Sequence, residues 1–277
     1  KYGCFDKYGE VYKKAAMQVT SDEMLGRFLV LFATALQDVE HKISYIYGVS
    51  QLVPPEGKER LGYTMATALV MCSQLEEAAD KLKNKNIPQD MINDVLRQAI
   101  NHVGDYERKH SGEKGFDLLW WVQAYIDGRI FLIERLEIEL FSFFRGNAIV
   151  YENRSGQVVA LAEDIALHRD GMALGCLHYR DNEGSWKASV EETEDSWIGY
   201  PYLQDGTVAH ERIELCKDKW KKVLVKGDPV IRLHIPPTGK LTPESVDITL
   251  QRAKEFIQKY YPDFVYKAIT CGSWIMD

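Results

Sequence analysis

The sequence predicts an α+β protein, with a helical N-terminal domain over residues 1–128 and a domain built on a mostly antiparallel sheet over residues 129–277. Up to Gly128, apolar residues recur at steps of three and four positions, whereas beyond it they fall mainly on alternate positions. The first period is that of a helix and the second that of a half-buried strand. Asp-Gly pairs at residues 170–171 and 205–206 then separate extended runs, which is typical of hairpins.

Several helices are expected in the first half. Ser21 is a residue type that caps helices, and acidic residues follow it in the first turn. Pro88 suits the first position of a helix, because its missing N–H would have no partner there. Pro54 and Pro55 break the chain between the first helix and the second. The expected ranges are 21–43, 60–83, 89–106 and 115–128.

The second half is expected to consist of strands separated by turn residues, with two exceptions. A short helix is expected over residues 217–224, and a longer one runs from Pro243 to Tyr260 with Thr242 as its N-cap. Single strands are expected over about 130–140, 230–235 and 264–271. The segments 148–161, 165–179 and 197–215 are each expected to form two strands, separated by turns at residues 153–156, 170–171 and 205–206.

Composition and charge narrow the function classes. The 277 residues carry 34 Lys and Arg against 41 Asp and Glu, for a net charge of −7. Phosphate contacts rely on clustered positive charge, and the chain has no dense Lys/Arg run, so we expect no nucleic-acid partner. No apolar run approaches the roughly 20 residues of a membrane helix, so we expect no membrane partner either.

The cysteines indicate the compartment. The 5 cysteines lie far apart, form no CxxC pair and are odd in number, which favours reduced thiols in a cytoplasmic protein over a disulfide framework. The sequence opens at Lys1 without a signal-peptide pattern. We expect residues of the natural protein to lie beyond both ends, and nothing in the sequence indicates the oligomeric state.

The most unusual stretch is LHIPPTGKLTPES, residues 233–245. In the strand before it, Arg232 and His234 fall on one face and apolar residues on the other. Two prolines then end the strand, because proline cannot donate to a ladder. The start of the next helix offers N–H groups and the positive end of a dipole to the loop, which predicts an anion site. The predicted binding residues are Pro237, Thr238, Gly239, Lys240, Leu241 and Thr242.

The loop has two other interpretations besides an anion site: a P-loop and an ordinary strand-to-helix connection. A P-loop requires a glycine five positions before the Gly-Lys pair and Ser or Thr directly after the lysine, but His234 and Leu241 stand there, which excludes a nucleoside triphosphatase of that type. The second interpretation is an ordinary strand-to-helix connection with a surface lysine, since helix N-termini occur in every helical protein.

The run from Gly227 through PPTGKLTPES to the final CGSW segment resembles a two-domain group of bacterial acyltransferase-domain proteins. These proteins have a helical N-acyltransferase N-terminal domain and a GNAT-like C-terminal domain, GNAT denoting the N-acetyltransferase fold. The segments IPQDMINDVL and DGRIFLIERLEIEL extend the resemblance upstream, so that it covers roughly residues 87–277. Two positions differ from the family pattern: Gly272 replaces a histidine, and Glu134 replaces a glycine before Arg135.

The resemblance implies a GNAT-like sheet domain that binds acetyl-CoA or another acyl-CoA as co-substrate. In such a fold, backbone N–H groups at a strand end polarise the thioester carbonyl and a nearby base deprotonates an amine. His234 is the predicted base, because its ordinary pKa lies near neutrality. The alternative is a histidine that only makes a structural hydrogen bond at a strand end. The tyrosine that serves as the acid in GNAT enzymes lies beyond the last strand, where this sequence stops.

Other candidate sites were weighed against structural alternatives. Cys271 would be a nucleophile in an acyl-cysteine mechanism, but a buried strand thiol is favoured. The spacing of His168, Cys176 and His178 falls short of a zinc pattern, so no metal is expected. Four aromatic residues would line an acceptor pocket or fill the core, and the core is favoured. These aromatic residues are Trp186, Trp197, Tyr200 and Tyr202. A separate acidic group, which consists of Glu191, Glu192, Glu194 and Asp195, is interpreted as a solvated loop.

Two function hypotheses remain. The first is an acyl-CoA-dependent N-acyltransferase acting on a small-molecule amine acceptor that the sequence does not identify. The second is a non-catalytic ligand-binding or scaffolding protein on a degenerate GNAT-like fold. Lys240 and the helix start favour the first, whereas the single glycine of PPTGK favours the second, because the usual GNAT loop has a Gly-x-Gly/Ala pattern.

Overall fold

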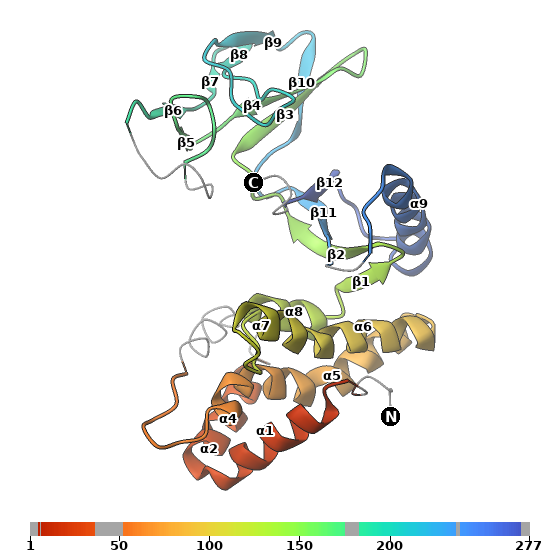
Figure 1. The fold of residues 1–277 in the computed structure, drawn as a ribbon. Helices are drawn as coiled ribbons and strands as arrows, with labels where there is room; N and C mark the ends of the chain where they lie inside the picture. The colour runs from red at the N-terminus through yellow and green to blue at the C-terminus, as the bar shows by residue number, and fades with distance from the viewer. Residues whose placement is uncertain (1–4, 6, 37–51, 175–182, 237–238, 273–277) are drawn as a thin grey trace. The chain divides into compact units, whose positions relative to one another are not determined.

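The computed structural model describes residues 5, 7–36, 52–174, 183–236 and 239–272 (Figure 1). The chain divides into two compact units. The first unit contains Lys1–Ile138 and Thr238–Pro262, and the second contains Glu139–Pro237 and Asp263–Asp277. The change from helices to strands lies between residues 126 and 130, where the sequence predicts it, but the last helix belongs to the first unit by its contacts.

The first unit is mainly helical, and α5 lies at its centre. Helices α1, α2, α6 and α8 all pack against α5. Small residues such as Ala66, Ala68, Ala78 and Ala79 are buried along α5, which allows its neighbours to approach closely. The helices are α1 (Gly9–Ser21), α2 (Glu23–Ala35), α4 (Leu61–Thr64), α5 (Ala66–Asn84), α6 (Gln89–Asn101), α7 (Val103–Lys109) and α8 (Leu119–Ile126).

Ser21 and Pro88 both stand close to a real helix N-terminus, as predicted, but each helix begins one residue later than these signals indicate. Ser21 ends α1, a helix that the sequence analysis did not predict, and Asp22 caps α2 by accepting a hydrogen bond from the N–H of Leu25. Pro88 is the N-cap of α6 rather than its first residue. The end of the first predicted helix, beyond residue 36, lies outside the described residues.

Gly128 ends α8 in the way its sequence predicts. Its φ is +62°, a left-handed conformation that glycine adopts without strain. The N–H of Gly128 bonds to the carbonyl of Tyr125 and that of Arg129 to the carbonyl of Ala124, the paired bonds of a Schellman motif. The turn directs the chain from the last N-terminal helix into the first strand.

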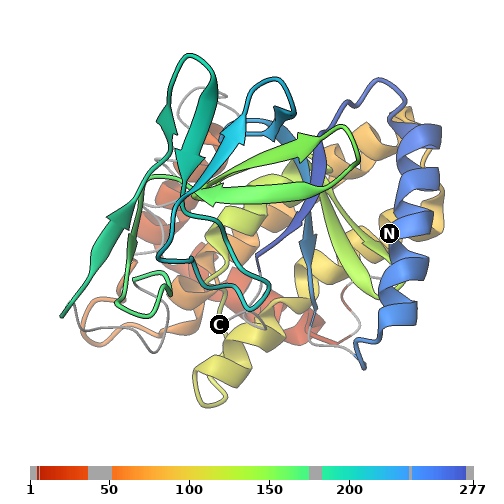
Figure 2. The same cartoon turned by 90° about the horizontal axis from the view of Figure 1, so that it is seen from above.

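A four-stranded sheet follows, with strand order β1-β2-β11-β12. Its strands are β1 (Ile130–Ile133), β2 (Leu136–Phe143), β11 (Pro229–His234) and β12 (Ala268–Cys271). The pair β11–β12 is parallel, and α9 (Pro243–Tyr260) connects the two strands. Within the first unit α9 packs against β1, as the two cartoon views show (Figures 1 and 2).

The remaining sheets of the second unit are antiparallel, as expected. One has the order β10-β3-β4, another pairs β5 with β6, and a third has the order β7-β8-β9. Their strands are β3 (Ala148–Asn153), β4 (Val158–Ala162), β5 (Ile165–Leu167), β6 (Trp186–Ala188), β7 (Glu191–Glu192), β8 (Ser196–Gly199), β9 (Ile213–Cys216) and β10 (Trp220–Leu224).

The short helix expected over residues 217–224 is wrong. Trp220–Leu224 forms strand β10, which pairs antiparallel with β3 from Trp220–Asn153 to Leu224–Val150. The lysine-rich segment has good helix formers, but pairing with β3 and burial of Leu224 outweigh that local preference.

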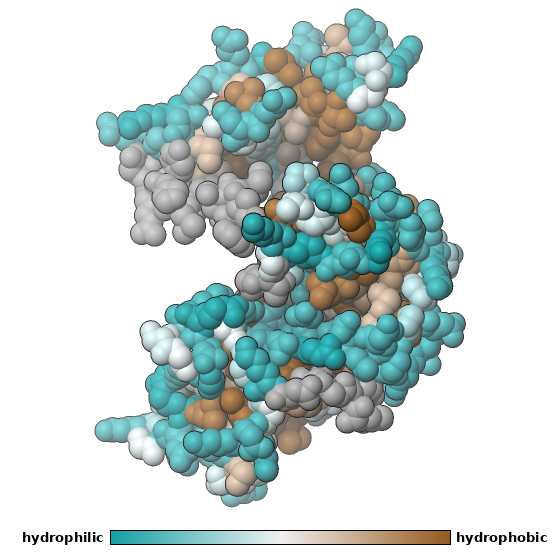
Figure 3. Space-filling view, turned by 45° about the vertical axis from the view of Figure 1, so that its right-hand side comes forward, coloured by the Kyte–Doolittle hydropathy of each residue, from teal (hydrophilic) through white to brown (hydrophobic). Residues whose placement is uncertain are grey.

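Hydrophilic residues cover most of the face drawn in Figure 3. Within the described part of the chain, no helix combines the length and the apolar character that a bilayer span requires.

Candidate active site

The parallel pair β11–β12 ends where the predicted site begins. The register runs from Val230–Ala268 to Leu233–Cys271 in the described residues, and His234 is the next residue of β11. Ile235 and Pro236 follow outside any described strand. Pro237, Thr238 and the residues after Gly272 lie outside the described residues, so the departure of the strand from its neighbour at the prolines stays a prediction.

His234 and Arg232 meet a buried carboxylate from β2. The Nε2 atom of His234 lies 3.1 Å from Oε2 of Glu139, and Nη1 of Arg232 lies 3.5 Å from the same oxygen. The side chains of His234 and Glu139 are 11% and 9% exposed, which makes the pair nearly inaccessible to bulk water. A carboxylate this deeply buried must have partners, and these two side chains are among them.

This contact determines what the imidazole can do. When Nε2–H donates to the Glu139 carboxylate, the neutral ring carries its lone pair on Nδ1. In carboxylate–histidine pairs that act as general bases, the carboxylate orients the ring and balances the charge that develops on it. The arrangement suits a general base better than a histidine with only a backbone partner.

The alternation along the strand predicts correctly that Arg232 and His234 share one face, but no sequence pattern singles out Glu139. A weak signal was present, because Glu137 and Glu139 alternate with Ile138 and Leu140 along a strand. The structure buries residues 136–140 on both faces of β2, so these glutamates do not face solvent. Only the pairing of β2 with β11 in the sheet identifies the partner of Glu139.

The predicted anion loop belongs to the first unit and is described by itself. Pro237 and Thr238 lie outside the described residues. Gly239 has a φ of +65°, so the single glycine of the loop occupies a conformation that other residues rarely adopt. Lys240 is exposed, and within the described residues its ammonium group contacts no carboxylate. Leu241 is also exposed, and Thr242 is the N-cap of α9.

The start of α9 offers fewer donors than the sequence analysis expected. A capping box uses two of them: the N–H of Ser245 donates to Oγ1 of Thr242, and the N–H of Thr242 donates to Oγ of Ser245. Pro243 has no N–H, so within the first turn the N–H of Glu244 is left for a ligand. An anion at this loop must therefore be held mainly by Lys240 and the loop amides.

Cys271 differs from the favoured interpretation. The thiol was expected to be buried in the last strand, but the residue is exposed, because it stands at the end of β12 opposite Leu233. Partial burial raises the pKa of the Cys271 thiol, and the positive charge of Arg232 opposes this shift only in part. A thiol with a raised pKa is mostly protonated at neutral pH, which disfavours an acyl-cysteine mechanism.

The four aromatic residues fill the cores of the antiparallel sheets. Trp197 is buried with Tyr151, Leu161 and Leu215. Trp186, Tyr200 and Tyr202 pack against a second cluster around Leu167, and the rings of Trp186 and Tyr200 lie 4.9 Å apart. These contacts support the core interpretation.

Two residues of the acidic group, which the sequence suggests is a solvated loop, lie in a strand instead. Glu191 and Glu192 form the exposed strand β7, and Glu192 pairs with Lys217 and Lys222.

Of the three residues considered as metal ligands, Cys176 and His178 lie outside the described residues. In the ranges that the structure describes, no group of three or more His, Cys, Asp or Glu side chains could hold a metal ion.

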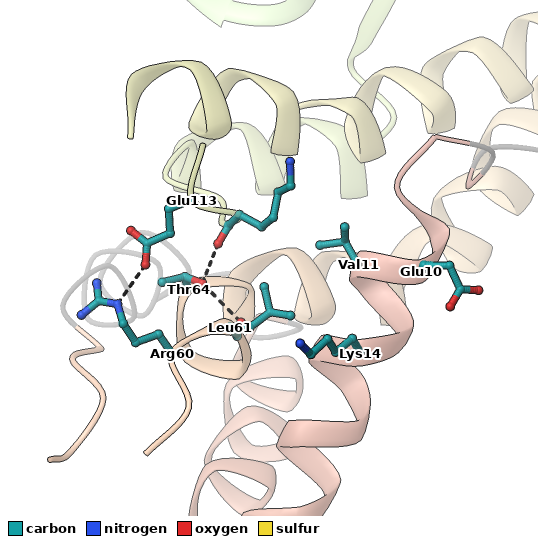
Figure 4. A pocket seen from close by; sticks show the side chains of 8 residues that line it. Glu10, Val11, Lys14, Arg60, Leu61, Thr64 and Glu113 are labelled. Atoms are coloured by element: carbon teal, nitrogen blue, oxygen red, sulfur yellow. Dashed lines mark hydrogen bonds and ion pairs between the residues drawn. The ribbon is translucent and has the colours of Figure 1, made fainter. Parts of the chain in front are cut away.

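A hollow of about 490 Å³ lies in the first unit, and the sequence analysis did not foresee it (Figure 4). Val11 and Leu61 give it apolar walls, and Arg60 pairs with Glu113 across 2.9 Å at its rim. None of the residues predicted from the sequence line it, so it is not part of the candidate site.

Comparison with known proteins identifies the family. A family model described as the GNAT-like C-terminal domain matches residues 138–277. The chain belongs to this family. The match includes the candidate base His234, its partner Glu139 and the loop before α9. A comparison with curated proteins finds no match.

Solved structures of acyltransferases share the fold. One, in complex with CoA and 10C-teicoplanin, has a TM-score of 0.52 at 17% identity over 94% of this chain and 55% of that chain. A complex with decanoyl-CoA and teicoplanin has a TM-score of 0.52 at 17% identity, over 95% of this chain and 58% of that chain. A mutant in complex with octanoyl-CoA has a TM-score of 0.51 at 16% identity over the same shares. The chain thus spans a little more than half the length of these proteins.

Proposed function

We propose that the protein is an acyl-CoA-dependent N-acyltransferase that transfers an acyl group to an amine. The observation that carries the proposal is the buried pair of His234 and Glu139, in which His234 is the last residue of β11. A general base with a fixed tautomer and a neighbouring carboxylate is what deprotonation of an amine requires.

In the proposed reaction the amine nitrogen attacks the thioester carbonyl, and the imidazole of His234 accepts the proton that the nitrogen loses. Glu139 holds the ring through Nε2 and balances the charge of the imidazolium. The carbon–sulfur bond then breaks, the amide is released, and the sulfur leaves as thiolate or thiol. Backbone N–H groups at the end of β11 would polarise the carbonyl during the attack.

The loop before α9 is proposed to bind the pyrophosphate of coenzyme A. The predicted residues are Pro237, Thr238, Gly239, Lys240, Leu241 and Thr242, of which the last four are described. The exposed ammonium of Lys240 and the loop amides supply the favourable charge and donors. The acyl-CoA molecules bound to the similar solved structures support acyl-CoA as co-substrate. Their decanoyl and octanoyl groups make a medium-length acyl chain the first to test.

A non-catalytic binding protein is the second candidate, because the loop has one glycine where the usual GNAT loop has two small residues. Thermal unfolding with coenzyme A and octanoyl-CoA tests the binding. A ligand at about 100 times its Kd stabilises the folded state by about 2.7 kcal/mol. If neither ligand shifts the Tm, the acyl-CoA proposal is wrong.

Turnover separates the two candidates once binding is shown. We expect Lys240→Ala to weaken coenzyme A binding and His234→Ala to abolish thiol release from octanoyl-CoA in the presence of a pool of primary amines. Lys254→Ala is the matched control, because it removes an exposed lysine from α9 away from the loop. Binding without turnover in the wild-type protein would favour the non-catalytic alternative.

A further inference from the structure

The turn between β1 and β2 holds the anion loop directly. Nη2 of Arg135 donates to the carbonyl oxygen of Gly239 at 3.1 Å, and Nε donates to that of Lys240 at 3.2 Å. The backbone N–H of Arg135 also donates to Oγ1 of Thr249, in α9, at 3.3 Å. One residue therefore connects the turn to the loop and to the helix that follows it, all within the first unit.

These two bonds determine the direction of two amide groups. A carbonyl and the N–H of the following residue belong to one planar trans peptide unit, in which they point in opposite directions. Holding the carbonyl of Gly239 therefore turns the N–H of Lys240 away from Arg135, and holding the carbonyl of Lys240 does the same for the N–H of Leu241. Successive N–H groups next to a left-handed residue such as Gly239 form the concave donor sets that bind anions.

The neighbouring residue strengthens the same contact. Glu134 has a φ of +53°, in the left-handed region that residues other than glycine rarely adopt. Its carboxylate pairs with Arg252 of α9. The ion pair and the strained turn together keep the hairpin against α9, so that the guanidinium of Arg135 reaches the loop carbonyls.

We propose that Arg135 is a positioning residue for the anion loop, which orients the N–H groups of Lys240 and Leu241 toward the pyrophosphate of acyl-CoA. The inference rests on the proposed function. The capping box leaves the start of α9 with few N–H groups for the anion, so the loop amides must supply the donors. Arg135, which lies outside the loop, is the residue that orients these amides. Arg135 acts through the loop and donates to its carbonyls.

The test is calorimetric titration of the full chain with coenzyme A. Without Arg135 the loop must be ordered when the ligand binds, which costs about tenfold in affinity for each backbone residue that is fixed. We therefore expect Arg135→Ala to weaken coenzyme A binding about 10- to 100-fold. Lys254→Ala is the matched control, because it removes an exposed basic side chain from α9 in the same unit without touching the hairpin or the loop, and its affinity should stay within about twofold.

A second probe separates positioning from general stabilisation. Acyl-pantetheine lacks the pyrophosphate, so its kcat/KM should be the same in Arg135→Ala and in the wild type. If Arg135→Ala does not fold, Arg135→Lys decides the question, because one ammonium cannot donate to both carbonyls in the same geometry and should weaken coenzyme A binding several-fold. Wild-type affinity in the folded variants would overturn the role of Arg135.

Titration with inorganic pyrophosphate distinguishes a failure of the positioning role of Arg135 from a failure of the proposed function. A wild-type protein that binds pyrophosphate but not coenzyme A would overturn the acyl-CoA proposal, and a loss of pyrophosphate binding in Arg135→Ala would still support the positioning role. If the wild type binds neither probe, both proposals are wrong.

Discussion

Replacement of Glu139 by glutamine tests the proposed base most directly. Glutamine has nearly the same shape, and its carbonyl oxygen can still accept hydrogen bonds from His234 and Arg232. The negative charge, however, is lost from a position where the side chain is 9% exposed. The substitution therefore separates the charge of Glu139 from its size.

The expected size of the effect follows from the geometry. The two partner atoms of Glu139 and His234 lie 3.1 Å apart. Opposite unit charges at about 4 Å are worth roughly 4 kcal/mol at an effective dielectric constant of about 20, and the retained hydrogen bond keeps part of this. If about 2.7 kcal/mol of imidazolium stabilisation is lost, kcat should fall about 100-fold, since about 1.4 kcal/mol corresponds to tenfold. That is within the range of about 10²- to 10⁴-fold for positioned acid–base groups.

The assay is thiol release from octanoyl-CoA with the amine acceptor found in the turnover screen. Glu139→Gln should lower kcat and leave the Kd for coenzyme A within about threefold, because the pyrophosphate contacts are elsewhere. Glu191→Gln is the matched control: it removes a carboxylate that is 58% exposed and pairs with Arg212 in the same unit. Equal kcat values in Glu139→Gln and the wild type would refute the role of the carboxylate.

Further outcomes are expected elsewhere. Thr242→Ala should lower the free energy of unfolding by about 1 kcal/mol in urea titrations, because it removes the capping box, and an unchanged value would contradict this. Tyr125→Phe should cost about 1–3 kcal/mol by the same measurement, because it takes from Nε2 of His102 a buried partner at 2.8 Å. Burial raises the pKa of Asp105, but the hydrogen bond and charge of His102 outweigh it and lower the pKa overall. Asp105 therefore stabilises the fold above its unfolded pKa of 3.8 and loses this effect as pH falls through the lower folded value, so Asp105→Asn should flatten the loss of Tm below about pH 4. Cys271→Ala should keep kcat within about threefold, whereas a complete loss would support an acyl-cysteine intermediate.

The sequence by itself determined features that depend on neighbouring residues. Thr242 and Pro243 set the start of α9, and the helix runs from Pro243 to Tyr260 as expected. Gly128 ended the last N-terminal helix, because its left-handed conformation is a local property. The side on which Arg232 and His234 lie also followed from the alternation along one strand.

Only the tertiary structure decided the features that depend on a partner far away in the sequence. Glu139 became the partner of His234 through the pairing of β2 with β11, across 95 residues. Residues 220–224 became a strand because β3 lies beside them. The contact between Arg135 and the loop carbonyls spans 104 and 105 residues. Local propensities cannot encode such contacts, because their energies arise only when distant segments are brought together.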